Sequence, residues 1–174
     1  MARYAVLLRG INVGKAKRVA MADLRALLAD LGYTGVATIL NSGNAVVTGP
    51  GTDVDEQAAR IERAIEERLG VSCRCLVLPA ALVREIVDGH PFADVADNGS
   101  RMMANILSAV PPVGDYDPVA ADPEHTRRAD RVIYQWCPDG VLAAPGIDEK
   151  RLGVAVTARN WNTMTKLVPL LEEA

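Results

Sequence analysis

The sequence predicts an α+β fold of two consecutive ferredoxin-like (βαββαβ) subdomains, the second irregular and extended by a C-terminal helix. Residues 1–79 carry apolar runs and amphipathic stripes in the order strand, helix, strand, strand, helix, strand. Residues 101–174 repeat this order more weakly, after a connecting helix and loop over residues 80–100. Right-handed crossovers around an antiparallel hairpin turn such an order into a ferredoxin-like sheet. Because the halves share a pattern rather than sequence identity, one mixed sheet with irregular additions is the rival interpretation.

The first strand and helix of the first half are marked by local signals. Tyr4–Leu8 is a short apolar run that Arg9 and Gly10 end, and a polar, glycine-containing loop follows over residues 9–18. The next helix has one apolar face, because apolar side chains recur at steps of three and four: Met21, Leu24, Leu28 and Leu31. Gly32 is the predicted stop of that helix.

A hairpin is predicted next, from two β-rich runs over residues 36–40 and 45–48. Asn41-Ser42-Gly43-Asn44 stands between them, and Asn and Gly tolerate the positive φ of tight turns. Asp53 followed by Glu56 then predicts a capped helix N-terminus. The helix that follows has the apolar stripe Val54, Ala58, Ile61, Ile65 and Leu69. We expect Gly70 to end it and a strand over residues 71–78 to complete the half.

The second half has weaker signals. We predict a connecting helix over residues 80–88 and a strand over residues 102–110. The proline-rich stretch 111–129 supplies at most a short helix, over residues 123–128, with Pro123 in its first turn.

The rest of the second half is predicted as a hairpin, a short helix, a strand and a long helix. The hairpin pairs residues 131–136 with residues 141–144, joined by Pro138-Asp139-Gly140. A helical turn over residues 147–152 and a strand over residues 154–157 follow. The final helix spans residues 162–173, and Pro169 inside it predicts a kink or an early end.

Composition limits the class of function. Of the 174 residues, 49% are hydrophobic and 24% are charged, which argues against disorder. The formal net charge is −3, whereas a dedicated nucleic-acid binder has a strongly basic balance. Nucleic acid is therefore an unfavoured partner, and any anion-binding surface has to be local.

No apolar run approaches the length of a membrane span, and the N-terminal run that Arg9 ends is too short for a signal peptide, so we expect a cytoplasmic protein with no membrane partner. The chain has three cysteines. Cys73 and Cys75 are two residues apart, and Cys137 lies far from them. We interpret all three as buried small hydrophobic side chains, because the Cys-x-x-Cys spacing and further ligands of a zinc site are missing. We expect neither a metal nor a cofactor.

Polar residues gather at one end of the predicted first sheet. In the ferredoxin-like order the first and second strands end where the third begins, and the first helix starts there. Helix N-termini present N–H groups and partial positive charge, which suits an anion. The predicted ligand-binding residues here are Arg9, Asn12, Lys15, Asn41, Ser42 and Asn44. The alternative is that the Asn-rich turn only meets the needs of a tight hairpin and that residues 15–18 are a solvated charge run.

A second polar cluster opens the last helix. Either Asn160 or Asn162 is the predicted cap, and Trp161 serves either packing or stacking of a ligand. Lys166 lies four residues after Asn162 and so on the same helix face. The predicted ligand-binding residues of this cluster are Arg159, Asn160, Trp161 and Lys166. The alternative is a capped helix anchored by one Trp.

Several stretches, in order along nearly the whole chain, resemble the bacterial domain-of-unknown-function 1697 family. They are Leu8-Arg9-Gly10-Ile11-Asn12-Val13-Gly14, Met21-Ala22-Asp23-Leu24-Arg25, Leu40-Asn41-Ser42-Gly43-Asn44, His90-Pro91-Phe92 and Thr157-Ala158-Arg159-Asn160-Trp161-Asn162-Thr163, then Lys166-Leu167. The family usually has a second Gly and an Asn after Gly14, where this chain has Lys15-Ala16-Lys17, which makes the loop less flexible. The resemblance implies two ferredoxin-like subdomains and implies no activity or catalytic residue.

The leading hypothesis is a binding module for a small phosphate-bearing or anionic ligand, with a nucleotide among the candidates. One alternative is an enzyme that clamps a small anionic substrate between Arg9 and Arg159. Against it, His90 and His125 pair with no obvious Ser, Cys or carboxylate in the sequence. The other alternative is a dimerising scaffold, and we expect either a monomer or a homodimer.

Overall fold

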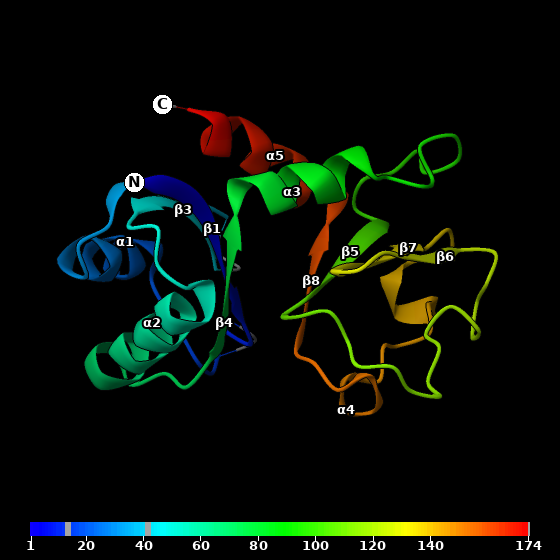
Figure 1. Ribbon diagram of the computed structural model, residues 1–174, viewed down its shortest axis with the longest axis horizontal. Helices are drawn as coiled ribbons and strands as arrows, with labels where there is room; N and C mark the ends of the chain where they lie inside the picture. The colour runs from blue at the N-terminus through cyan, green and yellow to red at the C-terminus, as the bar shows by residue number, and fades with distance from the viewer. Residues whose placement is uncertain (13–14, 41–42, 174) are drawn as a thin grey trace. The chain divides into compact units, whose positions relative to one another are not determined.

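The protein is α+β, as predicted, with two four-stranded antiparallel sheets and five α-helices in the part described (Figure 1). The computed structural model describes residues 1–12, 15–40 and 43–173. Its residues form two compact units, Met1–Arg84 with Lys166–Ala174, and Glu85–Thr165. The division falls inside two helices, so each unit takes part of both. The subdomain boundaries predicted from the sequence stay a prediction.

The sheet of the first unit has the order β2-β3-β1-β4, with every neighbouring pair antiparallel. Strands β2 and β3 follow one another in the chain and form a hairpin. Strands β1 and β4 pair although a long stretch of sequence separates them. The strands are β1 (Ala2–Arg9), β2 (Thr34–Ile39), β3 (Asn44–Gly49) and β4 (Arg74–Pro79).

Helices α1 (Met21–Asp30) and α2 (Val54–Leu69) cover one face of this sheet (Figure 1). The predicted apolar stripes of both helices are buried there. Leu24, Leu28, Ile61 and Ile65 belong to one core cluster that also contains buried residues of β1, β3 and β4. The predicted ends of α2 are confirmed. The Asp53 side chain accepts hydrogen bonds from the backbone N–H groups of the first turn, and Gly70 ends the helix in a left-handed conformation.

The sheet of the second unit has the order β6-β7-β5-β8, again with antiparallel neighbours. Its strands therefore follow the same order as those of the first unit. A proline-rich loop takes the place of the first crossover helix. The second crossover contains only the 3-10 turn η1 (Val141–Ala143) and the short helix α4 (Glu149–Leu152). The strands are β5 (Met102–Leu107), β6 (Thr126–Arg128), β7 (Val132–Trp136) and β8 (Val156–Asn160).

Two predictions for the second half are wrong. Residues 126–128, predicted at the end of a short helix, form strand β6, and the hairpin turn lies at residues 129–131 rather than at 138–140. Residues 141–143, predicted as a return strand, form η1. Three residues are too few to show the alternation of apolar and polar side chains that marks a strand. Residues 126–128 are a strand because they pair with β7.

Helices α3 (Ala80–Asp88) and α5 (Trp161–Glu172) complete the fold. Pro169 lies inside α5, yet the helix continues to Glu172. In the first unit, the Arg3 guanidinium donates to the Leu170 carbonyl at 2.7 Å, which places the end of α5 beside β1. Among the described residues, none of the helices combines the length and hydropathy needed to cross a membrane.

Candidate functional site

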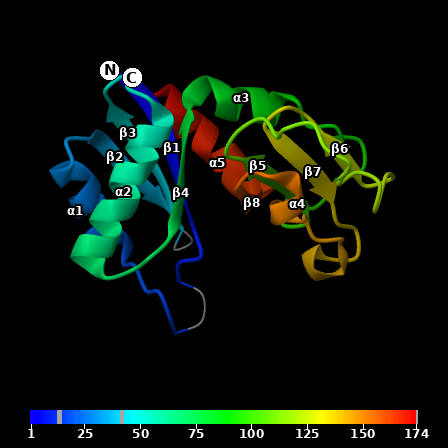
Figure 2. The same cartoon turned by 60° about the horizontal axis from the view of Figure 1, so that its bottom comes forward.

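The strand pairing of the first unit places two arginines opposite one another. The register of the antiparallel pair β1–β4 ends with Arg9 opposite Arg74, and both side chains are exposed. Figure 2 shows the end of β1 and the start of β4 at the same end of the sheet. Like charges directly opposite one another destabilise a strand pair. The sequence predicts a role for Arg9 but not for Arg74, because nothing local shows which strand lies beside β1.

The loop after β1 adds positive charge to this end of the sheet. Lys15, Lys17 and Arg18 are all exposed. Burial raises the pKa of the Cys73 thiol, the Glu62 carboxylate raises it further, and the Lys17 ammonium group opposes both effects. Cys73 is the residue before Arg74, so the charge of Lys17 acts at the same end of the sheet. We call Arg9, Lys17 and Arg74 the basic edge.

Asn12 holds the loop of the basic edge in shape. Its side-chain amide donates to the Val19 carbonyl at 3.0 Å and accepts from the Val19 N–H at 2.8 Å. Its backbone N–H donates to the carbonyl of Lys17 at 2.9 Å, and its φ is +54°. Asn adopts this left-handed conformation more readily than most residues. Asn12 thus sets the position of Lys17, and ligand contact by Asn12 stays a prediction.

Asn44 closes the hairpin beside the basic edge. It pairs with Leu7 of β1, its exposed fraction is 0%, and its side-chain amide donates to the Ile39 carbonyl at 3.2 Å. These contacts give Asn44 a structural role at the same end of the sheet as Arg9. Asn41 and Ser42, also predicted as ligand-binding residues, lie outside the described residues.

Arg159 in the second unit is buried, with 8% of its surface exposed. Its guanidinium donates to the Thr157 hydroxyl at 3.1 Å and to the Ala158 carbonyl at 2.8 Å. Burial lowers the pKa of Arg159 to about 10. A guanidinium turned back onto its own strand in this way supports local structure, and its predicted role in clamping a ligand is untested.

Asn160, rather than Asn162, caps the last helix, which confirms one of the two predicted caps. The Asn160 side-chain oxygen accepts from the Thr163 N–H at 3.0 Å and from the Thr163 hydroxyl at 3.2 Å. Trp161 follows, and its backbone N–H donates to the Gly99 carbonyl at 3.0 Å. Lys166 is exposed on the part of α5 that belongs to the first unit.

The Trp161 ring packs against aromatic neighbours of the second unit. Its centroid lies 4.4 Å from that of His90 at an interplanar angle of 49°, and 6.2 Å from that of Tyr134. The Tyr134 hydroxyl donates to the Ile86 carbonyl at 2.6 Å, and burial raises the pKa of Tyr134 to about 12. Of the two predicted roles for Trp161, these contacts favour packing.

The family model for proteins of unknown function named DUF1697 matches residues 1–134 of the chain, which is most of its length. The chain belongs to the DUF1697 family. A conserved bacterial protein from Streptococcus pneumoniae has a similar structure, with a TM-score of 0.66, 23% sequence identity and 98% of each chain covered. At this identity the likeness shows the shared fold alone. None of the curated proteins matches the chain.

Two of the segments that carry the DUF1697 resemblance contact each other in the second unit. His90 stacks on Trp161, and its ring Nδ1 accepts the N–H of Phe92 at 3.1 Å. Burial lowers the pKa of His90 from its ordinary value, which favours the neutral ring. The His-Pro-Phe segment therefore acts as an anchor for the start of α5.

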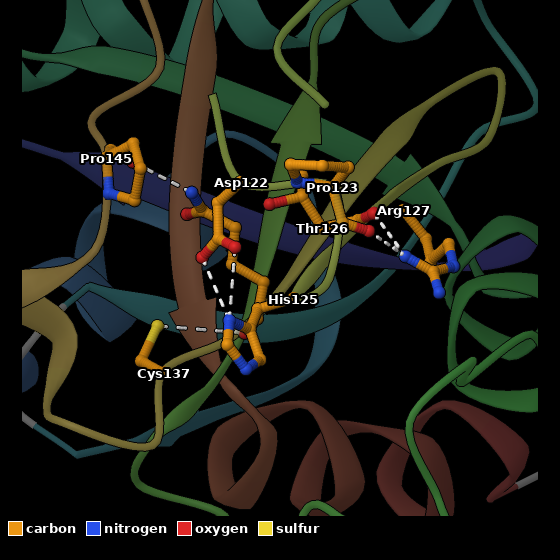
Figure 3. A network of polar contacts seen from close by, with 8 residues as sticks. Asp122, Pro123, His125, Thr126, Arg127, Cys137 and Pro145 are labelled. Carbon is orange, nitrogen blue, oxygen red and sulfur yellow. Dashed lines mark hydrogen bonds and ion pairs between the residues drawn. The ribbon is translucent and has the colours of Figure 1, made fainter. Parts of the chain in front are cut away.

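A second histidine in this DUF1697 protein has a partner that the sequence does not reveal. The His125 ring lies within hydrogen-bonding distance of Asp122, at 3.1 Å from its Nδ1 to each carboxylate oxygen, and both side chains are partly exposed (Figure 3). The prediction that neither histidine pairs with a carboxylate is therefore wrong for His125. The spacing of three residues within a turn was the available signal. Burial raises the pKa of the nearby Cys137 thiol, and Asp122 raises it further, which keeps that thiol protonated.

The described part of the DUF1697 chain brings together no group of three or more His, Cys, Asp or Glu side chains able to hold a metal. The three cations of the basic edge are exposed in the first unit, whereas the predicted residues Asn160 and Trp161 take part in capping and packing.

Proposed function

We propose that this DUF1697 protein is a binding module for a small phosphate-bearing or otherwise anionic ligand, held at the basic edge. The observation that carries the proposal is the register of β1 and β4, which sets Arg9 directly opposite Arg74. Residues opposed in this way have Cα atoms about 4.5–5.5 Å apart and side chains on the same face of the sheet. Both guanidinium groups can therefore reach one phosphate or carboxylate.

The chemistry of the three cations fits such a ligand. A guanidinium presents a planar fork of N–H donors that matches the oxygens of a carboxylate or phosphate, and an ammonium adds a mobile point charge. A bound anion would also offset the repulsion between the two opposed arginines. The net charge of the protein is −3, so a long polyanion would meet net negative charge on the molecule as a whole, which favours a small anion.

Calorimetry with inorganic phosphate and adenosine monophosphate at low ionic strength tests the proposal. Arg74→Gln removes one charge-assisted partner, for which about 1.5–3 kcal/mol is typical, so affinity should fall about tenfold or more. Arg63→Gln, which removes an equal charge from the exposed face of α2, is the matched control and should bind as the wild type does. Equal affinities of Arg74→Gln and Arg63→Gln would refute the proposal, as would the absence of any binding by the wild type.

We further infer that both units are variants of the ferredoxin-like fold and that the protein works in the cytoplasm. The first inference is supported by the matching strand orders of the two sheets. The second is supported by three free cysteines, since disulfides are rare where thiols are kept reduced.

A further inference from the structure

The second unit contains a pocket of about 210 Å³ at its proline-rich loop. Pro111, Pro112 and Leu152 give it an apolar wall, and the side chains of Arg128 from β6 and Arg151 from α4 line it as well. Among the described residues that line this pocket, none is acidic. The pocket shares no residue with the basic edge.

The wall of the pocket is held by packing from beneath. Leu152 is buried in a small core cluster with Leu107 of β5 and Ile133 of β7. A Cβ added to Gly153 would lie 3.3 Å from the Cγ atom of Pro112, so the proline-rich loop lies close against the end of α4. Since proline has a fixed φ, this wall loses little freedom when a ligand binds.

Arg151 is oriented by its neighbours. Its guanidinium carbon lies 4.7 Å from the centre of the Tyr116 ring. The Tyr116 hydroxyl accepts from the backbone N–H of Asp148 at 2.9 Å, and the Asp148 side chain accepts from the backbone N–H of Arg151 at 3.0 Å. A guanidinium packed over a ring uses its face for that contact and leaves its N–H donors, which lie in its plane, directed outward.

Arg128 is the last residue of β6, where its backbone is fixed opposite Ile133 of β7 while its side chain is exposed. Neither Arg128 nor Arg151 forms an ion pair with a carboxylate anywhere in residues 1–12, 15–40 and 43–173. Two guanidinium groups from separate elements thus border an apolar wall without an internal counter-ion.

We propose that this pocket binds a small organic anion, namely a carboxylate or phosphate monoester attached to a compact apolar or planar group. The two arginines bind the charged group, and Pro111, Pro112 and Leu152 contact the apolar part. Typical ligand pockets occupy about 300–1,000 Å³, so a pocket of about 210 Å³ takes a ligand smaller than a dinucleotide.

Titrations followed by NMR with four probes test the pocket: phenyl phosphate, benzoate, inorganic phosphate and benzyl alcohol. Phenyl phosphate or benzoate should bind at least tenfold more tightly than the other two, because only they carry both a charge and a ring. The order of phenyl phosphate and benzoate then tells which anionic group the arginines prefer. If inorganic phosphate or benzyl alcohol binds equally well, the proposal of an organic anion is wrong.

Substitutions assign the binding to this pocket. Arg151→Gln and Arg128→Gln should each weaken binding of the better probe about tenfold, while Lys150→Gln, the adjacent exposed position on α4, removes the same charge and should leave it unchanged. Urea unfolding of each variant shows whether it is folded. Arg74→Gln should also leave binding of the better probe unchanged, which separates this pocket from the basic edge. Wild-type affinity in both Arg151→Gln and Arg128→Gln would overturn the proposal.

Discussion

Gly43 offers a direct test of the close packing that sets the hairpin against β1. Its φ is +84°, and a Cβ added there would lie 2.8 Å from the Leu8 Cβ and 2.9 Å from the Ile11 Cδ1. Both neighbours are buried, so neither can move into solvent. Gly43→Ala should therefore be destabilising through two separable effects, a strained backbone and a steric clash.

Two other glycines isolate these effects. Gly10 has a φ of +76° but nothing within 4 Å of an added Cβ, and Gly51 has neither positive φ nor a close neighbour. A left-handed conformation costs a non-glycine residue about 1–2 kcal/mol, while Gly→Ala gains about 0.4–1 kcal/mol by restricting the unfolded chain. Gly51→Ala should be neutral or slightly stabilising, and Gly10→Ala should cost between 0 and about 1.6 kcal/mol. Overpacking adds about 1–3 kcal/mol, which brings Gly43→Ala to about 1–4.6 kcal/mol.

Urea unfolding followed by circular dichroism measures the free energy of unfolding of all three variants. The decisive quantity is the difference between Gly43→Ala and Gly10→Ala, because the backbone term is common to both. A difference below about 0.5 kcal/mol, within which distant effects usually fall, would show that the hairpin is not held against Leu8 and Ile11.

Three further predictions concern the same structure. Asn12→Gly keeps the positive φ but loses both side-chain hydrogen bonds to Val19, so its free energy of unfolding in a urea titration should be about 1–3 kcal/mol below that of the wild type. The free energy of unfolding of Asn12→Ala should be lower still, because Ala is also strained at positive φ. Arg74→Gln, in the absence of ligand, should raise the midpoint of unfolding at low salt by relieving repulsion with Arg9, and 1 M salt should abolish the gain; an unchanged midpoint at low salt would count against that repulsion. The pKa of Tyr134 is raised to about 12 in the folded state, so its contribution to stability is complete below its unfolded value of 10.0 and is lost as the pH rises to about 12. The deficit of Tyr134→Phe in unfolding free energy should therefore shrink across that range, and a deficit independent of pH would contradict the buried hydroxyl.

Much of the first unit could be predicted from its sequence because its signals are local. Asp53 caps α2 through N–H groups two and three residues away, and Gly70 ends the helix at its own φ of +67°. The apolar stripes needed only the helical period. In the second unit, no local signal marks β6, because its three residues form a strand only through their pairing with β7.

The candidate site divides in the same way. Arg9 was predicted from its place at the end of an apolar run, whereas its neighbour Arg74 depended on which strand pairs with β1. Asn44 was predicted from its turn sequence, but its burial and its bond to Ile39 depend on the hairpin. The sequence does not reveal the contact of His125 with Asp122, because two residues three apart meet only when the chain turns between them.

By itself, the sequence determined the α+β class, the helix caps and stripes of the first unit, and membership of the DUF1697 family, because periodicity and capping act over a few residues. Tertiary structure decided the strand register that opposes Arg9 and Arg74. It also decided the pocket, whose arginines come from β6 and α4 while its apolar wall comes from the loop after β5 and from Leu152 of α4. Strand register and pockets arise from contacts between distant segments, whose geometry is set by burial of the whole core rather than by any local pattern.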